Sequence, residues 1–187
     1  MNMNKKLLLG IAVVLALALL YSWMSYNRLV SASVAIDGQW AQVETQYQRR
    51  FDLIPNLVST VKGVAQQEQT VFGAIADART RYAGAVTVED KVKAANDMET
   101  GLARLLVIAE NYPQLTSSAS FQNLMVQLEG TENRISAERG RYNDRVREYN
   151  LITMRFPSNI AAAIFGFAEK SYFQAEQGAS GVPAVSF

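Results

Sequence analysis

The sequence predicts an all-α protein: an elongated antiparallel helical bundle with long heptad-patterned helices, on a single N-terminal transmembrane helix. Three observations lead to this prediction. An apolar stretch of membrane-spanning length lies near the N-terminus, apolar residues recur along the body about every 3.5 positions, and no segment has the alternating pattern of a strand. The predicted domains are an anchor at residues 1–28, a helical bundle at residues 29–176 and a tail at residues 177–187.

The apolar stretch begins at Leu7 and ends at Met24, and only Ser22 interrupts it. As a helix, its 18 residues would span about 27 Å, near the lower limit for crossing a bilayer. A cleaved signal peptide is the alternative. The small residues that could form a cleavage site, at positions 31–35, lie far beyond the apolar stretch. We therefore expect an uncleaved helix surrounded by membrane lipid.

The charges around this stretch predict its orientation. Lys5 and Lys6 precede it and only Arg28 follows closely, which favours a cytoplasmic N-terminus and a body in the periplasm or exterior. Of the 18 basic residues, only these two lysines lie within residues 1–24, so the chain after residue 24 has 16 basic against 17 acidic residues. This balance gives the body no general attraction to anionic lipid or nucleic acid.

The chain of 187 residues contains no histidine and no cysteine. Zinc sites built from these residues, haem held by histidine and iron–sulfur clusters are therefore excluded. Ser-His-Asp triads, Cys-His dyads and disulfides are excluded as well. Chemistry based on carboxylates alone remains open, and we expect no cofactor.

A long seam predicts the first body helix. Twelve of the fourteen positions spaced alternately by three and four from Ile36 to Tyr82 are apolar or aromatic, the exceptions being Arg50 and Glu68. The seam continues past Pro55, which predicts one bent helix or two nearly collinear helices and not a turn at this proline. Gly84 and the residues that follow end this segment.

Two further helices are predicted. One spans residues 88–110 and stops at residues 111–113, where a proline follows two polar residues. The other follows a polar loop with several potential caps at residues 116–120. Its main seam recurs every seven residues: Phe121, Leu128, Ile135, Tyr142, Tyr149 and Phe156. Pro157 ends it. Residues 160–168 form a short apolar helix, for which we favour burial in the fold or between protomers over contact with the membrane.

Three segments resemble the signature of the LemA family, in the family's order. They are residues 49–63 (RRFDLIPNLVSTVKG), residues 128–135 (LEGTENRI) with the Tyr-Asn pairs at 142–143 and 149–150, and residues 155–159 (RFPSN) with two later phenylalanines. The signature and interaction candidates are Arg49, Arg50, Asp52, Pro55, Asn56, Lys62, Glu129, Glu132, Asn133, Arg134, Tyr142, Asn143, Tyr149, Asn150, Phe156, Pro157, Phe165 and Phe167.

The resemblance implies a bacterial helical bundle anchored by one N-terminal membrane helix, without a defined catalytic activity. Family genes often neighbour those of membrane metalloproteases of the HtpX type or of TPM-domain proteins, so such proteins are the implied partners. Family descriptions have often placed the short N-terminus outside the cell. That orientation is opposite to the one that the charges predict.

One group of carboxylates could bind a divalent cation. Glu129, Glu132 and Asp144 could hold magnesium or calcium, but we favour ion pairs with arginines such as Arg134 and Arg139. Arg50 occupies a seam position, where a charge must be paired or solvated. Glu68 occupies such a position as well, and we expect these two charges to meet Glu138 or Arg145 of the third body helix in a polar layer that fixes register.

The sequence therefore favours a non-enzymatic scaffold that self-associates, as a homo-oligomer, and organises partner proteins in the envelope. An adaptor or regulator of a membrane metalloprotease is the alternative, and a carboxylate-based enzyme or metal-binding protein is disfavoured. No catalytic residue, metal ligand or nucleic-acid site is assigned.

Overall fold

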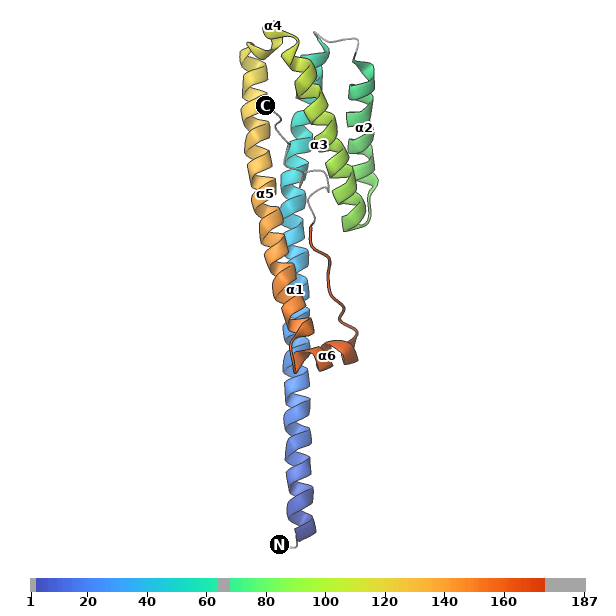
Figure 1. The fold of residues 1–187 in the computed structure, drawn as a ribbon, viewed down its shortest axis with the longest axis vertical. Coiled ribbons are helices and arrows are strands. Elements are labelled where there is room, and N and C mark those ends of the chain that lie inside the picture. Colours follow the sequence, from blue (N-terminus) through green and yellow to red (C-terminus); the bar gives the residue numbers. More distant parts are fainter. Residues whose placement is uncertain (1–2, 64–67, 174–187) are drawn as a thin grey trace, which may run out of the picture. The chain divides into compact units, whose positions relative to one another are not determined.

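The computed structural model describes residues 3–63 and 68–173, and every regular element in these residues is a helix. In chain order the helices are α1 (Met3–Lys62), α2 (Gln69–Gly84), α3 (Val88–Glu110), α4 (Pro113–Thr116), α5 (Ala119–Met154) and α6 (Ser158–Phe165), as Figure 1 shows. The prediction of an all-α protein is confirmed for this part of the chain. The predicted tail at residues 177–187 lies outside the described residues.

The described residues form two compact units. Unit 1 contains residues 3–43 and 138–173, and so includes the first part of α1, the end of α5, α6 and the segment after it. Unit 2 contains residues 44–63 and 68–137, which are the end of α1, α2, α3, α4 and the start of α5. α1 and α5 are uninterrupted helices that contribute residues to both units.

In unit 1, the first part of α1 leaves its apolar side chains uncovered. An 18-residue window of this helix has a mean hydropathy of 2.4, and none of the window is buried. Burial begins at Ser25 and Leu29, and α1 passes through residue 28 without a break. Length and composition make this part of α1 a candidate membrane anchor.

In unit 2 the chain reverses between α1 and α2, so the prediction of one bent or two collinear helices over residues 36–82 is wrong. α1 ends at Lys62, and Tyr82 near the end of α2 packs back against α1. Its ring centroid lies 5.7 Å from that of Tyr47 and 4.4 Å from that of Phe51. A helix that returns along its neighbour buries residues at the same spacing, so the period alone does not reveal the reversal.

The helix continues through Pro55, whereas a new helix begins beside Glu68. Pro55 lies exposed inside α1, as predicted, because the helix continues to Lys62. Glu68 is not a seam residue of a long helix. It is half-buried at the N-cap of α2, where its carbonyl oxygen accepts hydrogen bonds from the backbone N–H groups of Val71 and Phe72.

The hydroxyl of Tyr82 is buried and has no hydrogen-bond partner among the described residues. Burial, followed by the nearby Glu44 and Tyr47, raises the pKa of this phenol far above its usual value. The side chain therefore stays neutral at any physiological pH, and it contributes to unit 2 by packing.

The two later body helices begin where the sequence predicts. Thr87 caps α3, because its hydroxyl oxygen accepts a hydrogen bond from the backbone N–H of Asp90 at 3.1 Å. Ser118 caps α5 in the same way, accepting from the N–H of Phe121 at 3.3 Å. α3 ends at Glu110, immediately before the residues that were expected to stop it.

The seam of α5 differs from the prediction at its end. The first five residues of the seven-residue series are buried, but Phe156 lies beyond the helix and is 79% exposed. Arg145 is exposed as well, and Val146 is buried in its place. α5 ends at Met154 because the residue before a proline avoids the helical conformation, which leaves Phe156 off the helical stripe.

In unit 2, α2 and α3 approach each other closely at Gly101. A Cβ atom added at Gly101 would lie 2.9 Å from Cγ1 of Ile75, whose side chain is almost fully buried. Ile75 is β-branched and has little rotational freedom with which to move away. Glycine is thus required here for packing, although it lowers the intrinsic stability of a helix.

We predict that Gly101→Ala destabilises the protein by up to about 2 kcal/mol, because an overpacking cost of about 1–3 kcal/mol outweighs the gain of about 1 kcal/mol in helix propensity. Gly73→Ala is the matched control: it lies on α2 with open space around its Cα, and it should be stabilising. Thermal unfolding of the full chain in detergent, followed by circular dichroism, measures both. A stabilised Gly101→Ala variant would contradict the close approach.

Candidate functional site

In unit 1, side chains of α5 hold the extended segment that follows α6. This tail segment comprises residues 167–173 and has no helical structure. Gly166 ends α6 with a φ of 76°, a left-handed conformation that glycine adopts without strain, and this turns the chain into the tail segment. The N–H of Phe167 donates to the carbonyl of Ala162 at 2.9 Å, which completes the end of the helix.

Two asparagines of α5 pair with the backbone of the tail segment. The amide of Asn150 donates to the carbonyl of Lys170 and accepts from its N–H, both at 2.9 Å. Asn143 pairs with Phe173 in the same way, donating at 3.0 Å and accepting at 2.7 Å. Each side chain thereby satisfies both polar groups of one extended residue. We call this pair the asparagine clamp.

The spacing of the clamp follows from backbone geometry. Asn143 and Asn150 are seven residues apart, which corresponds to about 10.5 Å along a helix. Their partners Lys170 and Phe173 are three residues apart, which corresponds to about 10 Å in an extended chain. The two distances match, so the tail segment can run antiparallel to α5 and pair with both asparagines while the helix and the segment stay straight. Asn150 is only 3% exposed, and its amide would be costly to bury unpaired.

Three further contacts hold the tail segment. The hydroxyl of Tyr149 donates to the carbonyl of Ala168 at 3.0 Å. Nζ of Lys170 lies 3.0 Å from the hydroxyl oxygen of Ser33 and 3.4 Å from a carboxylate oxygen of Asp37, both on α1.

The guanidinium of Arg139 lies 4.5 Å from the ring centroid of Phe173, a cation–π distance. The tail segment therefore contacts both α1 and α5 within unit 1.

The clamp lies beside two buried tyrosines. Tyr142 packs against Trp40 of α1, with ring centroids 5.8 Å apart. Burial, and to a lesser extent Asp37, raises the pKa of Tyr142, and burial alone raises the pKa of Tyr149. Both phenols are therefore protonated around neutral pH, and Tyr149 keeps the proton that it donates to the tail segment.

In unit 2, Arg50 forms a polar layer with partners that differ from the predicted ones. Its guanidinium donates a hydrogen bond to Glu132 of α5 and lies 3.7 Å from a carboxylate oxygen of Glu99 on α3. Glu138 instead accepts a bond from Gln39. The layer joins three helices around a mostly buried charge, an arrangement that can fix their register.

The remaining charged residues of α5 are mainly paired along their own helix. Arg141 pairs with Glu138, and Arg145 with Glu148 at 2.9 Å. Pairs of this kind on a surface add little stability each. The other signature residues lie on exposed surface, as follows: Arg49, Asp52, Pro55, Asn56, Lys62, Glu129, Asn133 and Arg134.

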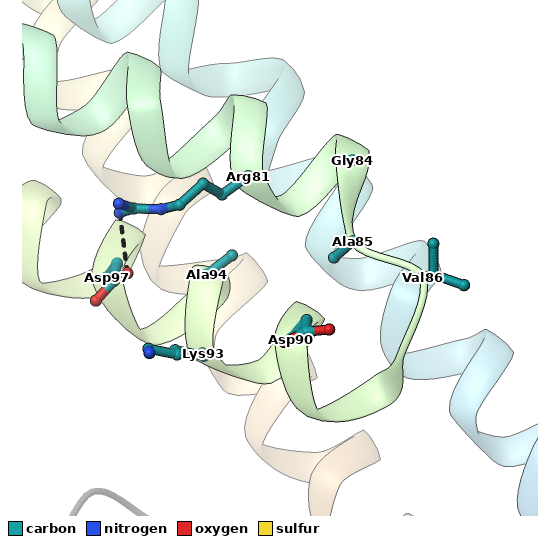
Figure 2. A pocket seen from close by; sticks show the side chains of 8 residues that line it. All are labelled: Arg81, Gly84, Ala85, Val86, Asp90, Lys93, Ala94 and Asp97. Carbon is teal, nitrogen blue, oxygen red and sulfur yellow. Dashed lines mark hydrogen bonds and ion pairs between the residues drawn. The ribbon is translucent and has the colours of Figure 1, made fainter.

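Unit 2 has a pocket of about 550 Å³ beside the turn between α2 and α3. Figure 2 shows Arg81 of α2 reaching Asp97 of α3, at 2.9 Å, across this pocket. Asp90, also in its lining, accepts the hydroxyl of Thr87 at 2.6 Å. The acidic groups are thus engaged by their neighbours.

No group of three or more acidic residues in the described part of the chain could hold a metal ion. Glu132 is bound to Arg50, and Asp144 pairs with Arg147 at 3.0 Å. Glu132 and Asp144 therefore form ion pairs, as the sequence favours, but with Arg50 and Arg147 and not with the expected Arg134, Arg139 or Arg145.

Asn143 and Asn150 are predicted only as part of a family signature, and the sequence does not predict Lys170 or Arg139 as partners in the tail-segment contacts. One signal was present: the dipeptide Tyr-Asn occurs twice at an interval of seven residues. Each tyrosine is buried on the seam, so the asparagine that follows it lies on the helix surface next to the seam. The repeat therefore indicates a polar stripe along that surface. Nothing in the pattern of residues 167–173 indicates what this stripe binds.

We predict that Asn150→Ala destabilises the protein by about 1–3 kcal/mol, because it leaves the backbone N–H and C=O of Lys170 without partners. Hydrogen exchange should show a matching loss of protection at that amide. Asn133→Ala is the control, because Asn133 is exposed on the same helix; it should change stability by less than about 0.5 kcal/mol. Equal effects of the two substitutions would contradict the clamp.

Comparison with known proteins gives two results. The chain is 28% identical over 189 residues to magnetosome protein MamQ 2 of Paramagnetospirillum magneticum, an alignment that covers 87% of this chain and 69% of that protein. It is 26% identical over 208 residues to magnetosome protein MamQ of Magnetospirillum gryphiswaldense, covering 97% and 76% of the two chains. The sequence model of the LemA family matches residues 39–187, which include the Arg50 layer and the clamp. The chain therefore belongs to the LemA family.

Proposed function

We propose that this protein is a membrane-anchored, non-enzymatic scaffold that self-associates and organises partner proteins in the bacterial envelope. The observation that carries the proposal is the start of α1: its apolar window is entirely unburied, so an apolar environment outside the fold has to cover it. A lipid bilayer supplies such an environment over the whole length of the stretch.

The side-chain chemistry agrees with a structural role. Asn150 of the clamp binds backbone groups, Arg50 binds Glu132, and Arg81 binds Asp97 across the α2–α3 pocket. The relatives are named as proteins of the magnetosome, and a scaffold in an envelope structure is consistent with that name.

The proposal includes an antiparallel bundle carried by a single membrane-spanning helix. Within unit 2, Arg50 links α1 to α3 and α5, and Tyr82 of α2 packs on α1. Within unit 1, Trp40 of α1 packs on Tyr142 of α5. Contacts of this kind between neighbouring long helices are typical of bundles.

The first test is the mass and content of the complex that mild detergent extracts from native membranes. We expect a large species made of this chain, because a scaffold that self-associates survives gentle solubilisation. Light scattering after size-exclusion chromatography measures the mass, and a second detergent serves as the control. A monomer would contradict self-association. A stoichiometric partner, above all a metalloprotease of the HtpX type or a TPM-domain protein, would favour the adaptor alternative.

The second test is the orientation in the membrane. The chain has no native cysteine, so single cysteines can be labelled selectively. The positive-inside reading predicts that Gln114→Cys, exposed at the start of α4, reacts with an impermeant maleimide in spheroplasts. Asn4→Cys is the control on the other side and should react only after lysis. The reverse pattern would place the N-terminus outside.

A further inference from the structure

The position of α6 along α1 is defined by contacts within unit 1. The ring of Tyr26 lies 5.0 Å from that of Phe165 and 5.7 Å from that of Phe167. Lys170 contacts Ser33 and Asp37, further along α1. The tail segment therefore runs away from the apolar stretch, and α6 is the part that lies next to its end. In Figure 1, α6 lies across α1 at this level.

α6 has two different faces. Ala161 and Ala162 are buried against unit 1, whereas Ile160 and Ile164 are 52% and 68% exposed. Phe165 is also largely exposed. Of the two kinds of burial expected for residues 160–168, burial within the fold is found for Ala161 and Ala162 but not for the large side chains of α6, and burial between protomers stays a prediction.

The surroundings of this exposed face are unusual for a surface in contact with water. Residues 156–168 contain no charged side chain, and Phe156 just before α6 is also exposed. The nearest charges in sequence are the basic Arg155 before the segment, and the acidic Glu169 followed by Lys170 after it. An uncharged helix that presents large apolar side chains outward can bury them at a membrane interface.

We propose that α6 and Phe156 lie in the membrane–water interface, with Ile160, Ile164 and Phe165 inserted at the headgroup level of the bilayer that α1 crosses. We call this surface the interfacial foot, and the molecules that cover it are membrane lipids. The inference rests on the proposed membrane anchoring of α1, and it adds a second lipid contact that lies more than a hundred residues later in the sequence.

The aromatic residues near the foot also indicate that the foot lies at the level of the lipid headgroups. Trp23 and Tyr26 are exposed at the end of the apolar stretch, where aromatic rings prefer the interface. Tyr26 is also the residue that contacts Phe165, so one aromatic group joins the end of the membrane stretch to the foot. A second protein copy would not require the apolar face to lie at this level of α1, whereas a bilayer does.

Fluorescence quenching by lipid in the full-length protein tests the foot. Single cysteines replace Ile164 in the foot, Leu15 in the apolar stretch and Glu148 on an exposed position of α5, and each is labelled with the environment-sensitive dye NBD. The protein is reconstituted in vesicles of zwitterionic and anionic phospholipid. These contain lipids with a doxyl quencher near the headgroup or near the end of the acyl chain.

We expect the Ile164→Cys probe to lose more fluorescence with the shallow quencher than with the deep one, and the Leu15→Cys probe to show the reverse preference. The Glu148→Cys probe should lose little with either. If Leu15→Cys is quenched and Ile164→Cys is not, the foot is overturned while the anchor stands. If neither is quenched, the anchor fails as well. NBD emission at Ile164→Cys that is blue-shifted but not quenched would indicate that protein, such as a second copy of the chain, covers this position. That result would overturn the foot.

Discussion

The pairing of two asparagine amides with an extended backbone determines where the C-terminal part of unit 1 lies. A segment outside a helix must find partners for its N–H and C=O groups, and water would otherwise supply them. Asn143 and Asn150 supply them from α5 at the spacing that an extended chain requires. Because the tail segment is fixed in this way, Lys170 reaches α1 and the preceding α6 is held beside Tyr26.

Much of this fold could be predicted from the sequence because the boundaries and apolar faces of helices depend on residues that are close together in the chain. The apolar stretch, the polar loop that contains the cap at Ser118 and the limits of α3 all follow from residues close together in the chain. The reversal after Lys62 could not be predicted in this way. The heptad spacing is shared by a helix that continues and by a helix that folds back, and residues distant in sequence decide between them.

In the candidate site, too, local features could be predicted from the sequence, whereas contacts between distant residues could not. A charge on a seam indicates that Arg50 needs a partner, but the pattern does not identify Glu99 and Glu132 among the many acidic residues. The repeated Tyr-Asn dipeptide indicates a stripe on α5, whereas its ligand is a backbone, which carries no side-chain signature. α6 was assigned as helical, and only its packing through alanines shows which apolar residues remain uncovered.

The continuity of α1 has a mechanical consequence. In unit 1 no loop separates the apolar stretch from the residues that bind α5 and the tail segment, so these parts share one helix axis. A stretch of 18 residues, about 27 Å, is slightly shorter than an average hydrocarbon core. A bilayer adapts to a stretch that is too short by thinning locally around it. Under the proposed anchoring, no loop can take up the difference in length, so the membrane must thin around α1 and the part of unit 1 that follows the stretch stays close to the membrane surface.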